Sequence, residues 1–263
     1  MLTGRLPELC QSIKCRRSTW RDLLEGAWLD DHLGYFATFL NYIFGIILAI
    51  IINREGTKFK AFWRFIFVLT IAVPQFVSLL VVNTMIQEHG VINLLLKELL
   101  GVGPLPFLTN ATWARVTVIV INLWVGIPYT LLAVTGILKN IPAELYEAAK
   151  VDGANAFVTF FKITMPYMMF VMTPNLITTF TGNINNFNVI YLLTNGAPAC
   201  DTYYRGTAGK TDLLVTWLYK LTIDNKDYNL GAVIGILTFI LMATLSLITY
   251  RRTGSYKNEE GFS

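Results

Sequence analysis

Long uncharged, apolar runs alternate with shorter polar segments along this chain. The runs are Tyr35–Ile52, Phe65–Ile86, Val116–Leu138, Tyr167–Leu193 and Leu230–Tyr250. By these bounds each holds 18 to 27 residues, and a helix needs about 20 apolar residues to cross a bilayer. In none of these runs do apolar and polar residues alternate with a period of two, and this excludes a transmembrane β-barrel. The pattern predicts an all-α polytopic transmembrane helical bundle with five spans.

Helix-breaking prolines or polar side chains occur inside three of these runs. Pro74 and Pro128 lie inside the second and third runs, where a missing N–H group and a ring clash produce kinks or local unwinding. The fourth run contains four asparagines within six residues, beside Gly182. Amides in lipid need partners, so they either bond neighbouring helices together or face a water-filled cavity. Their density favours the cavity.

The composition fits a membrane protein. The chain of 263 residues is 54% hydrophobic and only 14% charged, whereas soluble domains carry about 25% charged residues. The net charge of +4 is small and shows no basic stripe with interleaved aromatics, so we expect no nucleic-acid partner. Cys10, Cys15 and Cys200 form no CxxC pair, and His32 and His89 lie far apart. We expect no metal site, no cofactor and no catalytic constellation.

Basic residues in short loops set the orientation of the spans. They follow the first and last runs: Arg54, Lys58, Lys60, Arg64, Arg251, Arg252 and Lys257. Such loops stay in the cytoplasm. Alternation then makes Gln87–Ala111 external, Lys139–Pro166 cytoplasmic and Thr194–Asn229 external. The C-terminus, including the tail 253–263, is predicted to be cytoplasmic in a multi-pass protein of the cell membrane.

The first residues do not obey this scheme. Five spans with an internal C-terminus place residues 1–34 outside, yet Lys14, Arg16, Arg17 and Arg21 favour the inside. We interpret residues 1–34 as an atypical N-terminal segment with no visible signal peptide. Either upstream spans are missing from this chain, or the segment is an interfacial amphipathic helix.

The stretch Glu144–Pro166, ELYEAAKVDGANAFVTFFKITMP, is amphipathic and lies between two apolar runs. A first helix is predicted from Pro142 to Lys150, because a proline and acidic residues suit the start of a helix. Asp152-Gly153-Ala154 should end it, since glycine readily adopts the left-handed conformation. A second helix should run from about Ala156 to Thr164 and stop at Pro166.

The order Glu147-Ala148-Ala149, Gly153, Ile163 and Pro166 resembles the EAA loop of ABC importer permeases, with Met165 in place of the family's leucine. In that family the loop 139–166 would dock into an ATPase subunit. The residues that the resemblance assigns to this coupling are Glu147, Ala148, Ala149, Asp152, Gly153 and Pro166. ATP hydrolysis would reside on that separate subunit, so the chain itself would not be an enzyme.

Residues 35–252 resemble the permease domain of maltose/maltodextrin-type carbohydrate importers, in particular the larger permease subunit. The resemblance rests on NLWVGIPYTLLAVTGILKNIP, NINNFNVIYLLTNGAP and AGKTDLLVTWLYKL, and the tail SYKNEEGF is typical of Gram-positive members. It implies import of a maltodextrin-like or galacto-oligosaccharide-like sugar. The implied partners are a second permease subunit, two ATP-binding cassette subunits, an extracellular sugar-binding protein and the lipid bilayer.

The same resemblance places sugar contacts near the membrane midplane. The candidates are Gln75, Asn122, Gly126, Tyr129, Thr179, Asn183 and Asn186. Amides and hydroxyls exchange hydrogen bonds with sugar hydroxyls, and the ring of Tyr129 offers a stacking face. Ile71 and Gln75 depart from the family's tyrosine and serine, so we expect the sugar to differ in size or linkage.

Other functions fit the residues less well. Gly209-Lys210-Thr211 resembles the end of a phosphate-binding loop, but Tyr204 stands where its first glycine belongs. An importer of the same architecture for a non-sugar solute is the main alternative. An ion-coupled secondary transporter would show inverted repeats and acidic residues inside its spans, and neither is seen. A membrane scaffold would have no use for the EAA-like loop.

Overall fold

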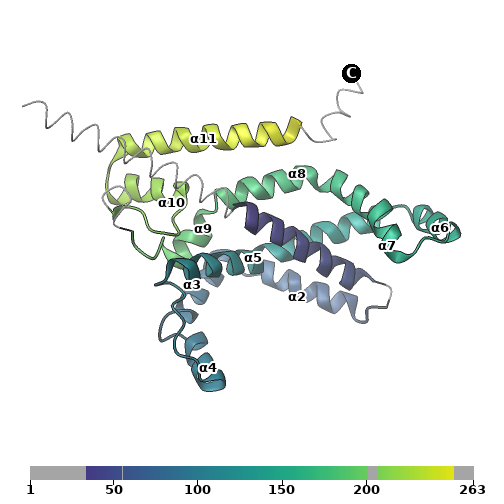
Figure 1. The fold of residues 1–263 in the computed structure, drawn as a ribbon, viewed down its shortest axis with the longest axis horizontal. Coiled ribbons are helices and arrows are strands. Elements are labelled where there is room, and N and C mark those ends of the chain that lie inside the picture. Colours follow the sequence, from purple (N-terminus) through teal and green to yellow (C-terminus); the bar gives the residue numbers. More distant parts are fainter. Residues whose placement is uncertain (1–33, 55, 201–205, 252–263) are drawn as a thin grey trace, which may run out of the picture. The chain divides into compact units, whose positions relative to one another are not determined.

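The computed structural model describes residues 34–54, 56–200 and 206–251 (Figure 1). Most of the predicted N-terminal segment 1–34 and the tail 253–263 therefore lie outside the described residues. Within the described part, four helices are long and apolar enough to cross a membrane, or five if one bent pair forms a single span. The four are Gly34–Asn53, α5 (Ala111–Asn140), the stretch Ala156–Thr194 and α11 (Tyr228–Arg251).

The second apolar run forms the bent pair. Helix α2 (Lys60–Ala72) ends before Val73, whose backbone is extended, and α3 (Gln75–Met85) begins after Pro74. Proline lacks the N–H group that would continue the helix, and it disfavours helical geometry in the residue before it. The predicted break at Pro74 is confirmed. In contrast, α5 continues through Pro128 without unwinding.

The fourth run is a broken helix. Helix α8 (Met165–Ile184) is followed by α9 (Phe187–Val189) and the π-helical segment η2 (Ile190–Thr194). The carboxamide oxygen of Asn186 accepts a hydrogen bond from the Val189 N–H at 3.2 Å. Asparagine side chains compete in this way with the helical backbone ladder. The break therefore falls within the run of asparagines that the sequence singled out.

The chain divides into two compact units. The first contains Phe76–Ile121 and Asn183–Met242, and the second contains Phe36–Gln75, Asn122–Gly182 and the chain from Ala243. Each unit has its own buried cores. Those of the first unit centre on Leu79, Val118, Ile190, Leu193 and, separately, Leu214, Trp217 and Ile234. That of the second unit centres on Tyr42, Ala49, Leu131, Val134, Met168 and Met172.

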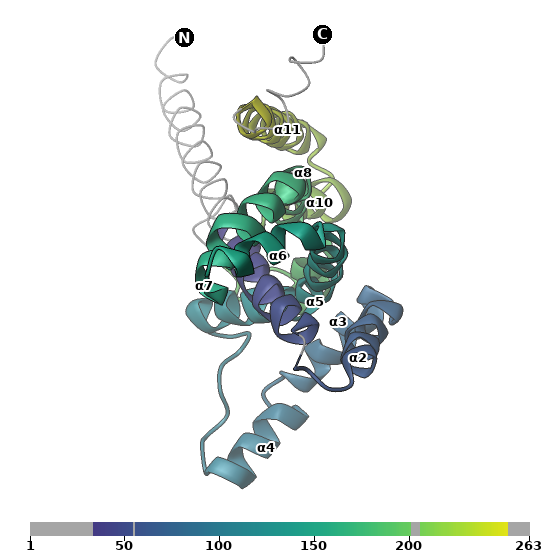
Figure 2. The ribbon, with the colours of Figure 1, turned by 90° about the vertical axis from the view of Figure 1, so that its right-hand side faces the viewer.

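Figures 1 and 2 show where the α5–α8 connection and helix α4 (Val91–Leu100) lie within their own units. In the second unit, α6 (Ala143–Val151) and α7 (Ala156–Thr159) form the connection between α5 and α8. In the first unit, α4 stands apart from the other helices of that unit. Its base is fixed by buried Asn93, which donates to the Gln87 carbonyl at 3.1 Å and accepts from the Leu105 N–H at 2.9 Å.

Candidate functional site

The connection between α5 and α8 is a helical hairpin (residues 142–164), named the coupling hairpin after the role that the sequence predicts for it. Its first helix, α6, starts after Pro142, with Glu144 in the first turn and Lys150 in the last. Proline suits a helix start, and these charges complement the helix dipole. Helix α6 thus agrees with the predicted first helix.

The turn of the hairpin is set by backbone hydrogen bonds. The Gly153 N–H donates to the Lys150 carbonyl at 3.1 Å, and the Ala154 N–H donates to the Ala149 carbonyl at 2.9 Å. Gly153 has a φ of 72°, in the left-handed region that glycine adopts without a steric cost. Asn155 then caps α7 by accepting a hydrogen bond from the Val158 N–H at 2.8 Å.

The second helix does not stop at Pro166, and that prediction is wrong. Helix α7 continues as the π-helical segment η1 (Phe160–Thr164) and then directly as α8. The Met165 N–H donates to the Phe160 carbonyl, five residues back. Pro166 is the second residue of α8 and directly follows η1; it has no N–H to bond back into η1, yet the helix continues through it.

One side-chain contact closes the hairpin, and apolar side chains cover its outside. The Tyr146 hydroxyl lies 3.1 Å from the Thr164 hydroxyl and so joins α6 to η1. Val151 is 87% exposed and Phe157 is 71% exposed. Of the predicted coupling residues, Ala149 is buried and the others are exposed: Glu147, Ala148, Asp152, Gly153 and Pro166. An exposed, partly apolar surface of this kind suits a protein partner.

Predicted sugar contacts in the second unit lie on α5, on α8 and at the start of α3. Asn122, Gly126 and Tyr129 are spaced for one face of α5. Asn122 is buried and Tyr129 is 56% exposed. Thr179 lies on α8, where its hydroxyl donates to the Asn175 carbonyl at 2.8 Å. Gln75, at the start of α3, is half-buried.

Gly126 allows a close approach of two helices. A Cβ atom at this position would overlap the carboxamide of Asn41, on helix Gly34–Asn53. Asn41 is 2% exposed, and its oxygen accepts a hydrogen bond from the Thr130 hydroxyl at 3.4 Å. Gly45 likewise faces Thr130, whose methyl group a Cβ would meet at 2.5 Å. Packing alone therefore requires a glycine at 126.

Tyr42 links the first helix to α8. Its hydroxyl lies 3.3 Å from the Thr179 hydroxyl and accepts a hydrogen bond from the Asn175 amide at 3.0 Å. Neither Tyr42 nor Asn175 was among the predicted site residues. The signal was available, because each is a polar residue inside an apolar run, where polar groups need partners.

Asn183 and Asn186 belong to the first unit, unlike the other predicted sugar contacts. Both are half-buried. Asn183 lies in the last turn of α8, and its carbonyl accepts a hydrogen bond from the Asn186 N–H at 3.4 Å. The side chain of Asn186 is the cap of α9. Any hydrogen bond that Asn186 makes to a ligand must therefore coexist with this capping bond.

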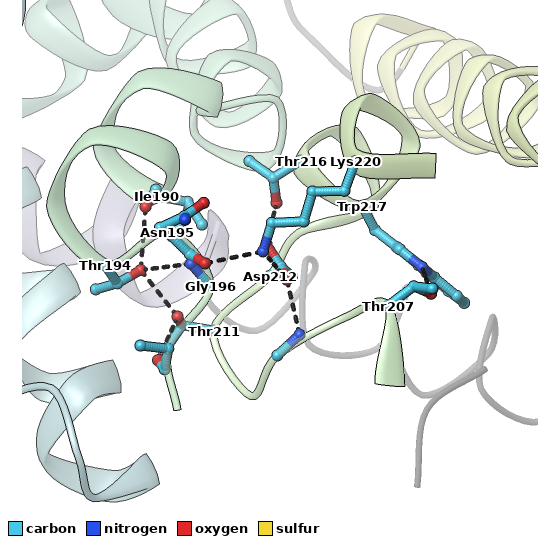
Figure 3. Close-up of polar contacts among 12 residues, drawn as sticks. Ile190, Thr194, Asn195, Gly196, Thr207, Thr211, Asp212, Thr216, Trp217 and Lys220 are labelled. Atoms are coloured by element: carbon cyan, nitrogen blue, oxygen red, sulfur yellow. Dashed lines mark hydrogen bonds and ion pairs between the residues drawn. The ribbon is translucent and has the colours of Figure 1, made fainter. Parts of the chain in front are cut away.

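The predicted external loop 194–229 is held by a buried ion pair (Figure 3). Asp212 accepts hydrogen bonds from the Lys220 ammonium group at 2.7 Å, the Gly209 N–H at 2.7 Å and the Thr216 hydroxyl at 2.9 Å. The same ammonium group donates to the Asn195 carbonyl at 2.8 Å. Within the loop, these bonds join the residues before α10 (Leu214–Tyr219) to α10 itself and to the π-helical segment η4 (Lys220–Asp224).

The Gly209-Lys210-Thr211 stretch has no free groups for a phosphate. The Gly209 N–H is taken by Asp212, and the Thr211 hydroxyl donates to the Ala197 carbonyl at 2.8 Å. Within the described part of the chain, no cluster of three or more His, Cys, Asp or Glu side chains could hold a metal ion.

The sequence and fold match a known family of membrane proteins. The family model described as "Binding-protein-dependent transport system inner membrane component" matches residues 41–253. The chain belongs to this family. Its members are transport components, which agrees with helices long enough to span a membrane.

Curated relatives of this family member transport sugars. The galactooligosaccharides transport system permease protein GanP of Bacillus subtilis is 42% identical over 244 residues, which cover 92% of this chain and 57% of the relative. The maltose/maltodextrin transport system permease protein MalF of Escherichia coli K12 is 40% identical over 220 residues, or 82% of this chain and 42% of the relative. The chain spans about half the length of the curated relatives it matches.

Solved structures share the fold of this family member. A bacterial ABC transporter involved in the import of the acidic polysaccharide alginate aligns with a TM-score of 0.73 and 22% identity, over 89% of this chain and 77% of that one. The alginate transporter in complex with a pentasaccharide-bound periplasmic protein aligns with a TM-score of 0.71 and 23% identity, over 84% and 74% of the two chains.

Proposed function

We propose that this chain is the permease subunit of an ATP-driven, binding-protein-dependent importer of oligosaccharides, of the galacto-oligosaccharide or maltodextrin type. The observation that carries the proposal is the coupling hairpin. It bears the Glu147-Ala148-Ala149 motif and exposes Val151 and Phe157 between two membrane spans. The 42% identity with a galactooligosaccharide permease supports a neutral oligosaccharide as the solute.

The permease would act with several other chains. The coupling hairpin would dock in the cytoplasm on one of two ATP-binding cassette subunits, where ATP is hydrolysed. A second permease subunit would supply the other half of the pore. An external sugar-binding protein would deliver the oligosaccharide to the loop 194–229. The short basic segments that follow the first and last spans support this orientation, with the C-terminus inside.

Coupling would be mechanical. The chain is helical without interruption from α7 through η1 to the end of α8, so a displacement of α7 by the ATPase is carried along a stiff element into the membrane. Tyr146 and Thr164 hold α6 to this element. Movement of α8 would carry Thr179 and Asn183 with it and so open or close the sugar path.

The sugar would be held by amides, hydroxyls and one ring. Asn122 and Tyr129 on α5, Thr179 and Asn183 on α8, and Gln75 on α3 are the contacts that we propose. Gly126 and Asn186 are the remaining proposed sugar-site residues. Gly126 leaves room for the side chain of Asn41, and Asn186 lies at the start of α9. Amides both donate and accept, as sugar hydroxyls require.

The test combines two hairpin variants with uptake of labelled oligosaccharides in cells that carry the whole importer. Glu147→Lys reverses an exposed charge, and Gly153→Pro forbids the φ of 72°. We expect uptake and sugar-stimulated ATP hydrolysis to fall at least about tenfold, with normal amounts of the complex in the membrane. This is the size expected when a hot-spot contact of about 1.4 kcal/mol or more is lost.

The matched control is Glu98→Lys, the same charge reversal on exposed α4, and it should leave uptake unchanged. Normal uptake in both hairpin variants would overturn the coupling role. A wild-type importer that takes up no oligosaccharide but accumulates another solute would overturn the sugar assignment.

A further inference from the structure

Three aromatic rings of the first unit pack against one another. Phe187 and Tyr191 are stacked, with ring centroids 4.9 Å apart and planes inclined by 17°. Tyr219 meets both rings edge-on, at 5.0 Å from Phe187 and 5.2 Å from Tyr191. Tyr219 comes from α10, so the fold brings it to a pair that is distant in the sequence. We call these three residues the aromatic cluster.

The aromatic cluster is not part of a hydrophobic core. On η2 the buried side chains are Ile190, Leu193 and Thr194, and Tyr191 is directed elsewhere. On α10 the buried side chains include Leu214 and Trp217, whereas Tyr219 is half-buried. Within the described part of the chain, the three rings belong to none of the clusters of buried residues and their packing partners. Each ring keeps part of its surface accessible.

The surroundings of the aromatic cluster are polar. Asp224 is the last residue of η4, which directly follows Tyr219, and it is exposed. Asn186 directly precedes Phe187 and caps its short helix. Phe187 and Tyr191 thus follow the asparagine pair Asn183 and Asn186 along the chain, and Tyr219 comes from within the loop 194–229. Hydrocarbon would be an unfavourable neighbour for these charged and amide groups.

Such a site has the chemistry of a carbohydrate subsite. Pyranose rings present flat patches of C–H groups, which pack on aromatic faces, and a rim of hydroxyls, which pair with phenols, carboxylates and amides. Building on the function proposed above, we propose that the aromatic cluster binds a pyranose unit of an oligosaccharide. The pyranose bound by the aromatic cluster comes after the pyranoses bound by the asparagine pair in the sugar chain. The aromatic cluster therefore serves oligosaccharides longer than a disaccharide.

The experiment compares sugars of two lengths in the whole importer. Uptake of galactobiose and galactotetraose, and of maltose and maltotetraose, is measured with saturating binding protein. Tyr191→Ala and Tyr219→Ala should lower the ratio of tetrasaccharide to disaccharide uptake about threefold to tenfold, as expected for one lost ring contact. Tyr191→Phe, which keeps the ring, should stay within about twofold of wild type, because the ring supplies the contact.

The matched control is Tyr228→Ala, because Tyr228 is 63% exposed in the same unit but outside the aromatic cluster. It should leave the ratio unchanged. An unchanged ratio in both cluster variants would overturn the subsite, and so would an equal loss of both lengths, which indicates a structural role. If the wild type transports none of the four sugars, the proposed function itself fails.

A second measurement does not depend on transport. An oligosaccharide with a diazirine group at its non-reducing end is photolysed on the membrane-embedded importer, and the labelled peptides are identified by mass spectrometry. Labelling of the segment that contains Phe187 and Tyr191, displaced by free tetrasaccharide, is the expected result. Labelling confined to other segments would overturn the subsite.

Discussion

At the scale of single residues, two glycines decide how closely the first helix approaches α5. Gly126 admits the carboxamide of Asn41, and Gly45 admits the methyl group of Thr130. The close contact lets buried Asn41 pair with Thr130 inside a region of apolar side chains. Without that approach the buried Asn41 oxygen would lose this hydrogen bond, which is costly away from water.

Gly126→Ala should therefore destabilise the protein by about 1–3 kcal/mol, because the added methyl group overpacks a tight contact. The matched variant is Gly136→Ala in the same helix, where a Cβ meets nothing within 4 Å. That change should be neutral or stabilise by up to about 1 kcal/mol, since alanine favours helix. Thermal unfolding in detergent measures both.

A double variant separates packing from any sugar contact at this position. Adding Asn41→Ala to Gly126→Ala frees the space that the new methyl group needs, so part of the lost stability should return. If Gly126→Ala has wild-type stability but impaired uptake, the close-approach role is refuted and a direct sugar role is favoured.

The sequence could predict the residues of this contact only in part. Polar Asn41 and Thr130 stand out in apolar runs, but their pairing depends on the rotation of two helices about their axes. Hydrophobic periodicity does not fix that rotation when a helix is apolar on all sides. The family resemblance assigns Gly126 to the sugar, and its packing role is visible only in the fold.

At the scale of elements, Asp212 organises the loop 194–229. Its carboxylate receives three donors, and its side chain is 2% exposed. The pair with Lys220 joins residues on both sides of α10 and fixes the path of the chain between them. Buried charges are tolerated only when they are paired and hydrogen-bonded in this way.

Lys220→Met should destabilise the loop by about 3 kcal/mol, because it leaves the Asp212 carboxylate buried without its counter-charge. Limited proteolysis of the purified protein should then cut within 194–229 much faster than in wild type. The matched variant is Lys226→Met, since Lys226 is exposed in the same loop. Equal protease resistance of the Lys220 and Lys226 variants would refute the role of the ion pair.

Elements with continuous apolar runs were predicted well. The first, third and fifth runs correspond to Gly34–Asn53, α5 and α11, with ends that differ by a few residues. The break at Asn185 and the π-helical segments were not predicted, because both depend on local backbone hydrogen bonding rather than on hydrophobicity. The helix α10 inside the loop 194–229 was also not predicted from the sequence, because it is stabilised by long-range packing on α11.

At the scale of the whole molecule, the proposed topology rests on charge in short loops. The segment between the first helix and α2 is basic, and the coupling hairpin is two spans further on. If the bent pair α2 and α3 crosses the membrane once, both segments lie on one side. The Gln87–Ala111 and 194–229 segments then lie on the other side.

Single cysteines labelled in intact cells by a membrane-impermeant maleimide test this arrangement, after the three native cysteines are replaced by alanine. Gly103→Cys and Ile223→Cys should label from outside. Lys58→Cys and Ala156→Cys should label only after the membrane is opened, because a charged reagent does not cross the hydrocarbon core. All four positions are exposed, so access to the side chain is not limiting. Labelling of Ala156→Cys in intact cells would refute a cytoplasmic coupling hairpin.

The π-helical segment η1 has a consequence for insertions and deletions. In a π-helix each N–H bonds to the carbonyl five residues back, and in an α-helix to the carbonyl four residues back. A π-helical turn therefore contains one extra residue. Removal of one residue between Phe160 and Thr164 would convert η1 to ordinary α-helix and keep the coupling hairpin in register with α8. The same deletion inside α8 would rotate everything before it by about 100°. The boundary between the hairpin and the membrane helix is thus a place where the chain can lose a residue without rotating the proposed docking surface relative to α8.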